Sequence, residues 1–94
     1  MSKASAAALE LNKAFALCVP ANQKKRMSEV EWSRSLEKFH GEARAIRQKL
    51  SLGPIARAMA TYHFQKLLLK GGFEASIVRK VVFSLVLNAF AAKA

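Results

Sequence analysis

The sequence predicts an all-α fold, a compact bundle of about four helices in a single domain that spans residues 1–94. Several stretches repeat apolar residues at three- and four-residue steps, which is the spacing of one helix face. Only two prolines and four glycines interrupt the 94 residues, and Gly71-Gly72 give the clearest helix stop. Apolar residues make up 52% of the chain, which excludes a disordered tail, and a length of 94 residues suffices for a single core without disulfides or metal.

The first predicted helix covers residues 4–19. One face carries apolar side chains at helical spacing, namely Ala4, Ala8, Leu11, Phe15 and Cys18. Pro20 ends this helix, because the residue before a proline disfavours helical dihedrals. We expect residues 1–4 to be frayed, and residues 20–27 to form a basic linker that contains Lys24, Lys25 and Arg26.

The second predicted helix covers residues 28–51. Ser28 and Glu31 have the spacing of a capping box, in which each side chain bonds the other residue's backbone N–H. An apolar seam follows in steps of four and three: Trp32, Leu36, Phe39, Ala43, Ile46 and Leu50. We interpret this seam as a core-facing stripe rather than a self-pairing coiled coil, which needs a longer run. The remaining faces carry the best candidates for a basic surface: Arg34, Lys38, Arg44, Arg47 and Lys49.

The third predicted helix covers residues 54–70, with Pro54 at its first position, where a missing N–H costs least. Apolar residues cover most of its circumference, and its polar residues Arg57, Thr61 and Gln65 recur every four positions. This pattern predicts a mostly buried helix with one narrow stripe in water. Gly71 and Gly72 supply a left-handed helix end, and Phe73 can fold back onto the last apolar turn.

The fourth predicted helix covers residues 74–92 and is almost wholly apolar after Lys80. Arg79 and Lys80 make it too short for a membrane span, which needs roughly twenty apolar residues. Helices three and four are therefore expected to form the centre of the bundle. Phe83 and Leu87 lie opposite much of the main apolar face of this helix, and Phe90 lies near its end. A monomer would leave this patch in water, so we expect a homodimer through the patch, the alternative being a central, fully covered helix.

The net charge of the chain narrows the classes of partner that we expect it to bind. Sixteen basic and six acidic residues give a net charge of +10, which attracts nucleic acid or acidic protein surfaces. Our leading interpretation is a small, non-enzymatic and possibly regulatory protein that engages nucleic acid, or a protein associated with it, through the second helix and Lys24–Arg26. The alternative is a protein-interaction module or inhibitor that docks on an acidic partner without touching nucleic acid.

Chemistry-bearing residues are sparse. Cys18 is the only cysteine, aspartate is absent, and His40 and His63 have no carboxylate or cysteine at ligand spacing. No phosphate-binding loop or nucleophile motif occurs. We therefore expect no enzymatic activity, no cofactor and no metal. Glu10, Asn12 and Lys13 interrupt any signal-peptide core, so we expect a cytoplasmic protein that does not enter membranes.

One stretch resembles a known family. Residues 64–73, FQKLLLKGGF, and residues 77–82, IVRKVV, are similar to a helical repeat of the RecX family. In such repeats a helix ends in a basic-Gly-Phe turn and the next helix opens with aliphatic and basic residues. The family carries several repeats, whereas this chain has at most one, within residues 64–82. The resemblance implies binding to a recombinase filament on DNA, and it assigns no individual site residue.

Overall fold

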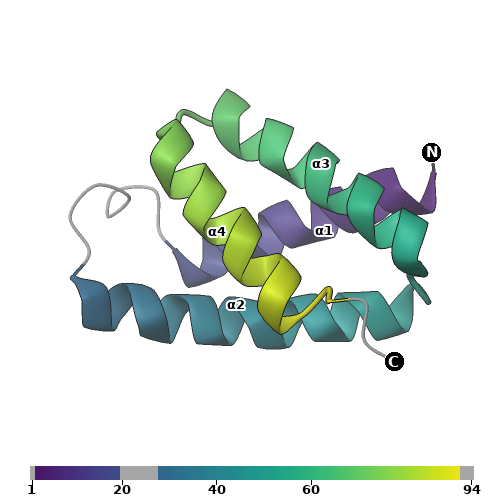
Figure 1. Cartoon of the computed structure of the whole chain (residues 1–94), viewed down its shortest axis with the longest axis horizontal. Coiled ribbons are helices and arrows are strands. Elements are labelled where there is room, and N and C mark those ends of the chain that lie inside the picture. Colours follow the sequence, from purple (N-terminus) through teal and green to yellow (C-terminus); the bar gives the residue numbers. More distant parts are fainter. Residues whose placement is uncertain (1, 20–27, 92–94) are drawn as a thin grey trace.

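A computed structural model describes residues 2–19 and 28–91, and in these ranges the chain forms four helices. They are α1 (Lys3–Cys18), α2 (Glu29–Lys49), α3 (Pro54–Lys70) and α4 (Ala75–Asn88). Figure 1 shows α2 along the lower edge of the molecule and α3 above it, with α1 farther from the viewer behind α3 and α4. In the same view α4 runs diagonally down from the turn after α3 until its last turn overlaps α2. The prediction of an all-α bundle of about four helices is confirmed.

The local signals that start and stop the helices are present. Ser28 Oγ accepts the Glu31 backbone N–H at 3.2 Å, and Glu31 Oε1 accepts the Ser28 N–H at 3.0 Å, so the predicted capping box starts α2. At the end of α3, Gly72 has a positive φ of 96°, and the Phe73 N–H donates to the Leu68 carbonyl. This geometry is a Schellman turn, which reverses the chain into α4.

The core is centred on α1, not on α3 and α4 as the sequence predicted. The fully buried Phe15 ring meets three other aromatic rings edge-on: Phe39 at 5.3 Å, Phe73 at 5.5 Å and Phe64 at 6.0 Å between centroids. The most extensive helix contacts join α1 to α3 and to α2. The small side chains of Ala4, Ala7 and Ala8 are buried and permit this close packing. The apolar density of α3 and α4 misled the prediction, because it does not reveal which helix the others surround.

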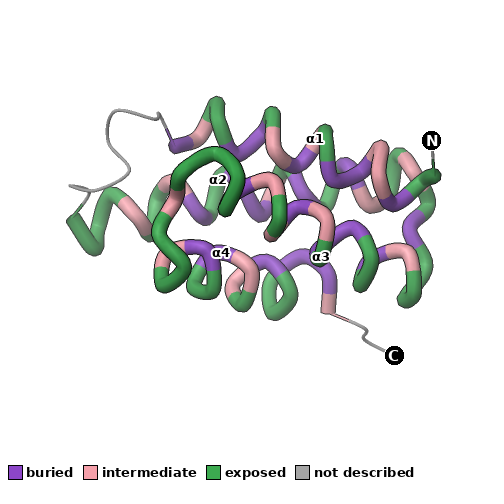
Figure 2. Tube along the Cα trace, turned by 90° about the horizontal axis from the view of Figure 1, so that it is seen from above, coloured by how far each residue is buried: buried purple, intermediate pink, exposed green. Residues whose placement is uncertain are grey.

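The orientation of α3 is also opposite to the predicted one. Arg57 and Thr61, expected in water, are buried, and Gln65 is half-buried. Ile55, Met59 and Tyr62 are exposed instead, with 57% of Tyr62 accessible. The polar groups tolerate burial because they are bonded: Arg57 Nη1 donates to the Leu52 carbonyl, and Thr61 Oγ1 donates to the Arg57 carbonyl at 2.8 Å. Figure 2 shows the resulting alternation of buried and exposed positions along each helix.

The last helix ends at Asn88, four residues before the predicted end. The N–H groups of Ala89 and Phe90 both donate to the Leu85 carbonyl, and Phe90 turns inward until only 4% of it is exposed. Burial of this aromatic ring against the core competes with continuation of the helix, since a buried Phe contributes about 1.5–3 kcal/mol.

Candidate functional site

The predicted basic surface is divided in the structure. Lys24, Lys25 and Arg26 lie outside the described residues. Arg44 Nη1 donates to the Asn88 carbonyl, and Arg47 Nη1 donates to the Ala89 carbonyl, each at 3.0 Å. These carbonyls lie at the negative end of α4, so the two arginines cap that helix. Arg44 and Arg47 therefore bind carbonyl groups of the same chain, whereas the sequence analysis predicted that they bind an anionic partner.

The other three basic residues of α2 remain exposed, but they differ in their contacts. Lys49 Nζ pairs with Glu10 of α1 at 3.1 Å. Arg34 and Lys38 are exposed, and no ion pair within the described residues involves either side chain. Of the predicted anion-binding residues in the described ranges, Arg34 and Lys38 are therefore the most available to a partner.

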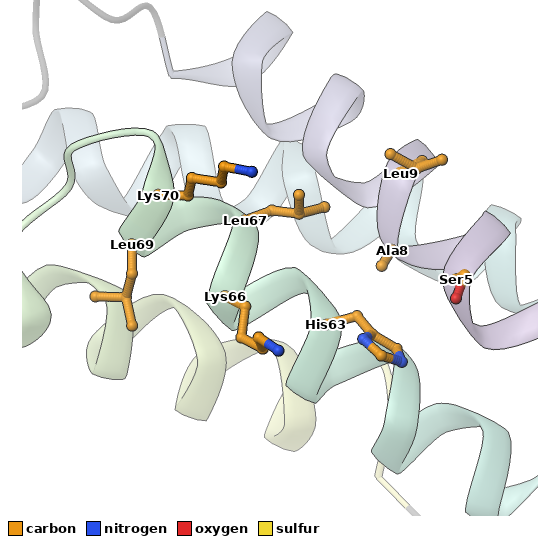
Figure 3. A pocket seen from close by; sticks show the side chains of 8 residues that line it. All are labelled: Ser5, Ala8, Leu9, His63, Lys66, Leu67, Leu69 and Lys70. Atoms are coloured by element: carbon orange, nitrogen blue, oxygen red, sulfur yellow. The ribbon is translucent and has the colours of Figure 1, made fainter.

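A groove with a volume of about 530 Å³ lies between α1 and α3. Figure 3 shows that Leu67 and Lys70 extend from α3 toward α1. The walls are mostly apolar, and the lining residues are Ser5, Ala8 and Leu9 of α1 with His63, Lys66, Leu67, Leu69 and Lys70 of α3. A groove of this size falls within the range of ligand-binding sites.

The charged residues that line the groove are all positive. Lys66 and Lys70 are exposed in the groove wall, and α3 contains no acidic residue. The single carboxylate of α1, Glu10, is paired with Lys49 of α2. Lys66 Nζ also lies 5.2 Å from the centre of the Tyr62 ring, a cation–π contact on the exposed side of α3. The groove thus combines an apolar lining with a positive rim.

Exposed apolar side chains continue from the groove along α3. Ile55, Met59, Tyr62 and Leu69 are all exposed at four- and three-residue steps, with Lys66 between the last two. The sequence analysis missed this exposed stripe, because it assigned these residues to the core. The available signal was their heptad spacing, which is typical of a stripe that meets one partner helix.

The predicted self-association surface on α4 is partly as expected. Phe83 and Leu87 are exposed, with 68% of Phe83 accessible, and Val86 lies beside them. Phe90 is a correction, because it packs in the core of the same chain and is not available to a partner. The homodimer stays a prediction.

A charge placed in the α4 patch tests this prediction. If two copies pair through Phe83 and Leu87, Phe83→Glu should shift the molecule from dimer to monomer in light scattering, because burying an unpaired carboxylate is costly. Val30→Glu changes an exposed apolar residue of α2 and should leave the mass unchanged. A monomeric wild-type mass at micromolar concentration, unchanged by Phe83→Glu, would remove the dimer from consideration.

Burial shifts the pKa of two titratable residues, His40 and Cys18. His40 is buried, and its Nε2 lies 2.5 Å from the Ser84 hydroxyl, a hydrogen bond that joins α2 to α4. Burial lowers the pKa of His40, and the nearby Arg44 lowers it further. Partial burial has the opposite effect on the Cys18 thiol and raises its pKa, which disfavours a reactive thiolate. Sequence reasoning could not pair His40 with Ser84, since they are distant along the chain.

The lowered pKa of His40 predicts a dependence of stability on pH. The unfolded chain takes up a proton at His40 near pH 6.5, whereas the folded chain takes it up only at lower pH. The free energy of unfolding should therefore fall as the pH drops below about 6.5. His40→Gln keeps a polar partner for Ser84 but cannot titrate, so urea unfolding of this variant should depend less on pH. Identical pH profiles for both proteins would exclude this role of His40.

Within the described ranges, no three His, Cys, Asp or Glu side chains lie close enough together to hold a metal ion. None of the helices in those ranges has the length and apolar character needed to cross a membrane.

Comparison with known protein families, curated proteins and solved structures found no match. The resemblance of residues 64–82 to a RecX repeat therefore stays a prediction, and function must be argued from the surfaces themselves.

Proposed function

We propose that this chain is a non-enzymatic binding module that docks an acidic, amphipathic helix of a partner protein in the groove between α1 and α3. The observation that carries the proposal is the combination, in one groove, of an apolar lining with Lys66 and Lys70 and with no acidic residue on α3. Apolar lining supplies affinity, and the lysines select a partner with carboxylates beside its apolar face.

A helix suits this surface better than an extended peptide. The described residues form no strand whose edge could accept a further strand, whereas the groove runs between two helices. An amphipathic helix places anchors at one-turn spacing into such a groove. The stripe of Ile55, Met59, Tyr62 and Leu69 has the same spacing and would widen the contact. The net charge of +10 would accelerate encounter with an acidic partner.

Nucleic-acid binding through α2 and Lys24–Arg26 is the second candidate. It is favoured by the exposed Arg34 and Lys38, which lie on the same helix and make no ion pair with another described residue. Such contacts to phosphates require mobile basic side chains and little defined geometry. The two candidates use different faces of the molecule and can be separated.

Fluorescence anisotropy with three probes separates them. The first probe is a helical peptide of about five turns with leucines on one face and glutamates elsewhere, the second carries lysines in place of the glutamates, and the third is random-sequence DNA. Docking in the groove predicts binding of the glutamate peptide and none of the lysine peptide. Binding of DNA alone, with a steep loss on adding salt, would favour the second candidate and overturn the first.

A further inference from the structure

A second cavity lies at the opposite end of α3, beside the final turn of α4. It has a volume of about 370 Å³ and is lined by Pro54, Arg57, Ala58, Thr61, Val86 and Phe90. Most of this lining is apolar, and Arg57 is its one ionised group. The cavity shares no lining residue with the groove between α1 and α3.

An arginine such as Arg57 is an unusual residue in the lining of a mostly apolar cavity. Only 8% of the residue is exposed, yet no carboxylate in the described part of the chain forms an ion pair with it. Within the described ranges its side chain donates one hydrogen bond, from Nη1 to the Leu52 carbonyl at 3.2 Å, although a guanidinium has five N–H donors. No buried side-chain nitrogen of the described residues lacks a hydrogen-bond partner, so the Arg57 nitrogens that make no bond are accessible from the cavity and can bind an anion.

The helix position makes the positive charge still less favourable. Arg57 lies in the first turn of α3, where the helix dipole already places positive potential. The N-cap of this helix is Gly53, which has no side chain to accept the first N–H groups. The helix terminus and the lack of a carboxylate partner among the described residues both disfavour the positive charge. A single carboxylate beside Arg57 would offset both.

We infer that this cavity is a binding site for a small carboxylate with an apolar tail. The carboxylate pairs with the Arg57 guanidinium, whose planar donors match two carboxylate oxygens. The tail lies against Ala58, Val86 and Phe90, which form the apolar part of the lining. This assignment is independent of the proposed docking of a partner helix and concerns another face of α3.

Octanoate and octanol are suitable probes, since they share an aliphatic tail and differ in charge. Titration into the ¹⁵N-labelled protein should shift the amide signals of Ala58, Val86 and Phe90 to saturation with octanoate. Octanol should bind at least about tenfold more weakly, because it lacks the charge that pairs with Arg57. Equal affinities for the two compounds, or no saturable shift at these amides, would overturn the assignment.

Three variants separate the charge from the cavity. Arg57→Gln removes the charge and should weaken octanoate binding at least about tenfold. Ala58→Phe fills the cavity from an exposed position, keeps Arg57 and should produce the same loss, which covers the case in which Arg57→Gln fails to fold. Arg79→Gln removes an exposed arginine of α4 that does not line the cavity, and should leave binding unchanged. Retained octanoate binding in Ala58→Phe, or an equal loss in Arg79→Gln, would contradict the site.

Discussion

Replacing Phe15 with alanine is expected to lower the free energy of unfolding by about 3–5 kcal/mol, the largest stability effect that we predict. Phe15 is fully buried and its ring meets the rings of Phe39, Phe64 and Phe73. The substitution removes apolar burial, leaves a cavity and breaks three edge-to-face pairs, each worth about 0.5–1.5 kcal/mol beyond its area. Urea unfolding followed by circular dichroism measures the loss.

Leu17→Ala is the matched control on the same helix. Leu17 lies two residues away and is 85% exposed, so its truncation should change the free energy of unfolding by no more than about 0.5 kcal/mol. If the two variants were equally stable, α1 could not be the centre of the core.

The second large effect concerns binding. The double variant Lys66→Glu with Lys70→Glu should weaken binding of the glutamate peptide at least about tenfold, and more at low salt. Both lysines line the groove, and each reversal replaces an attraction to the peptide by a repulsion of similar size. Both side chains are exposed, so the fold should be retained. Anisotropy titrations at two salt concentrations measure the change.

A reversal of equal charge on α2 provides the control. Arg34→Glu with Lys38→Glu lowers the net charge by the same amount but lies outside the lining of the groove. The affinity for the glutamate peptide should change little, because the variant reduces only the long-range electrostatic attraction. Any binding to DNA should decrease. If both double variants weakened peptide binding equally, the peptide would be attracted by the net charge of the protein and not by the groove.

The sequence was sufficient for the elements whose apolar residues fall on one face. The seams of α1 and α2, the capping box at Ser28 and the turn at Gly72 were predictable because each depends on neighbours within a few residues. In α3 apolar residues occupy most sides, so their period could not identify the inner face. Burial of Arg57 depends on the Leu52 carbonyl and on packing against α4, which no local pattern contains.

The candidate site was less accessible to sequence reasoning for the same physical reason. Its walls come from residues 5–9 and 63–70, which only the packing of α1 on α3 brings together. Arg44 and Arg47 have the appearance of free cations in the sequence. Their partners are the carbonyls that end α4, more than forty residues away. Of the five basic residues predicted on α2, Arg34, Lys38, Arg44 and Lys49 are exposed and Arg47 is half-buried, and their individual contacts required the tertiary fold.

Mapping the bound glutamate peptide by NMR tests the docking proposal most directly. Titration into ¹⁵N-labelled protein should shift the amide signals of Ala8, Leu9, His63, Lys66 and Lys70, which line the groove, while the signals of Arg34 and Lys38 on α2 remain in place. Shifts confined to α2, or to the Phe83 and Leu87 patch of α4, would contradict docking in the groove.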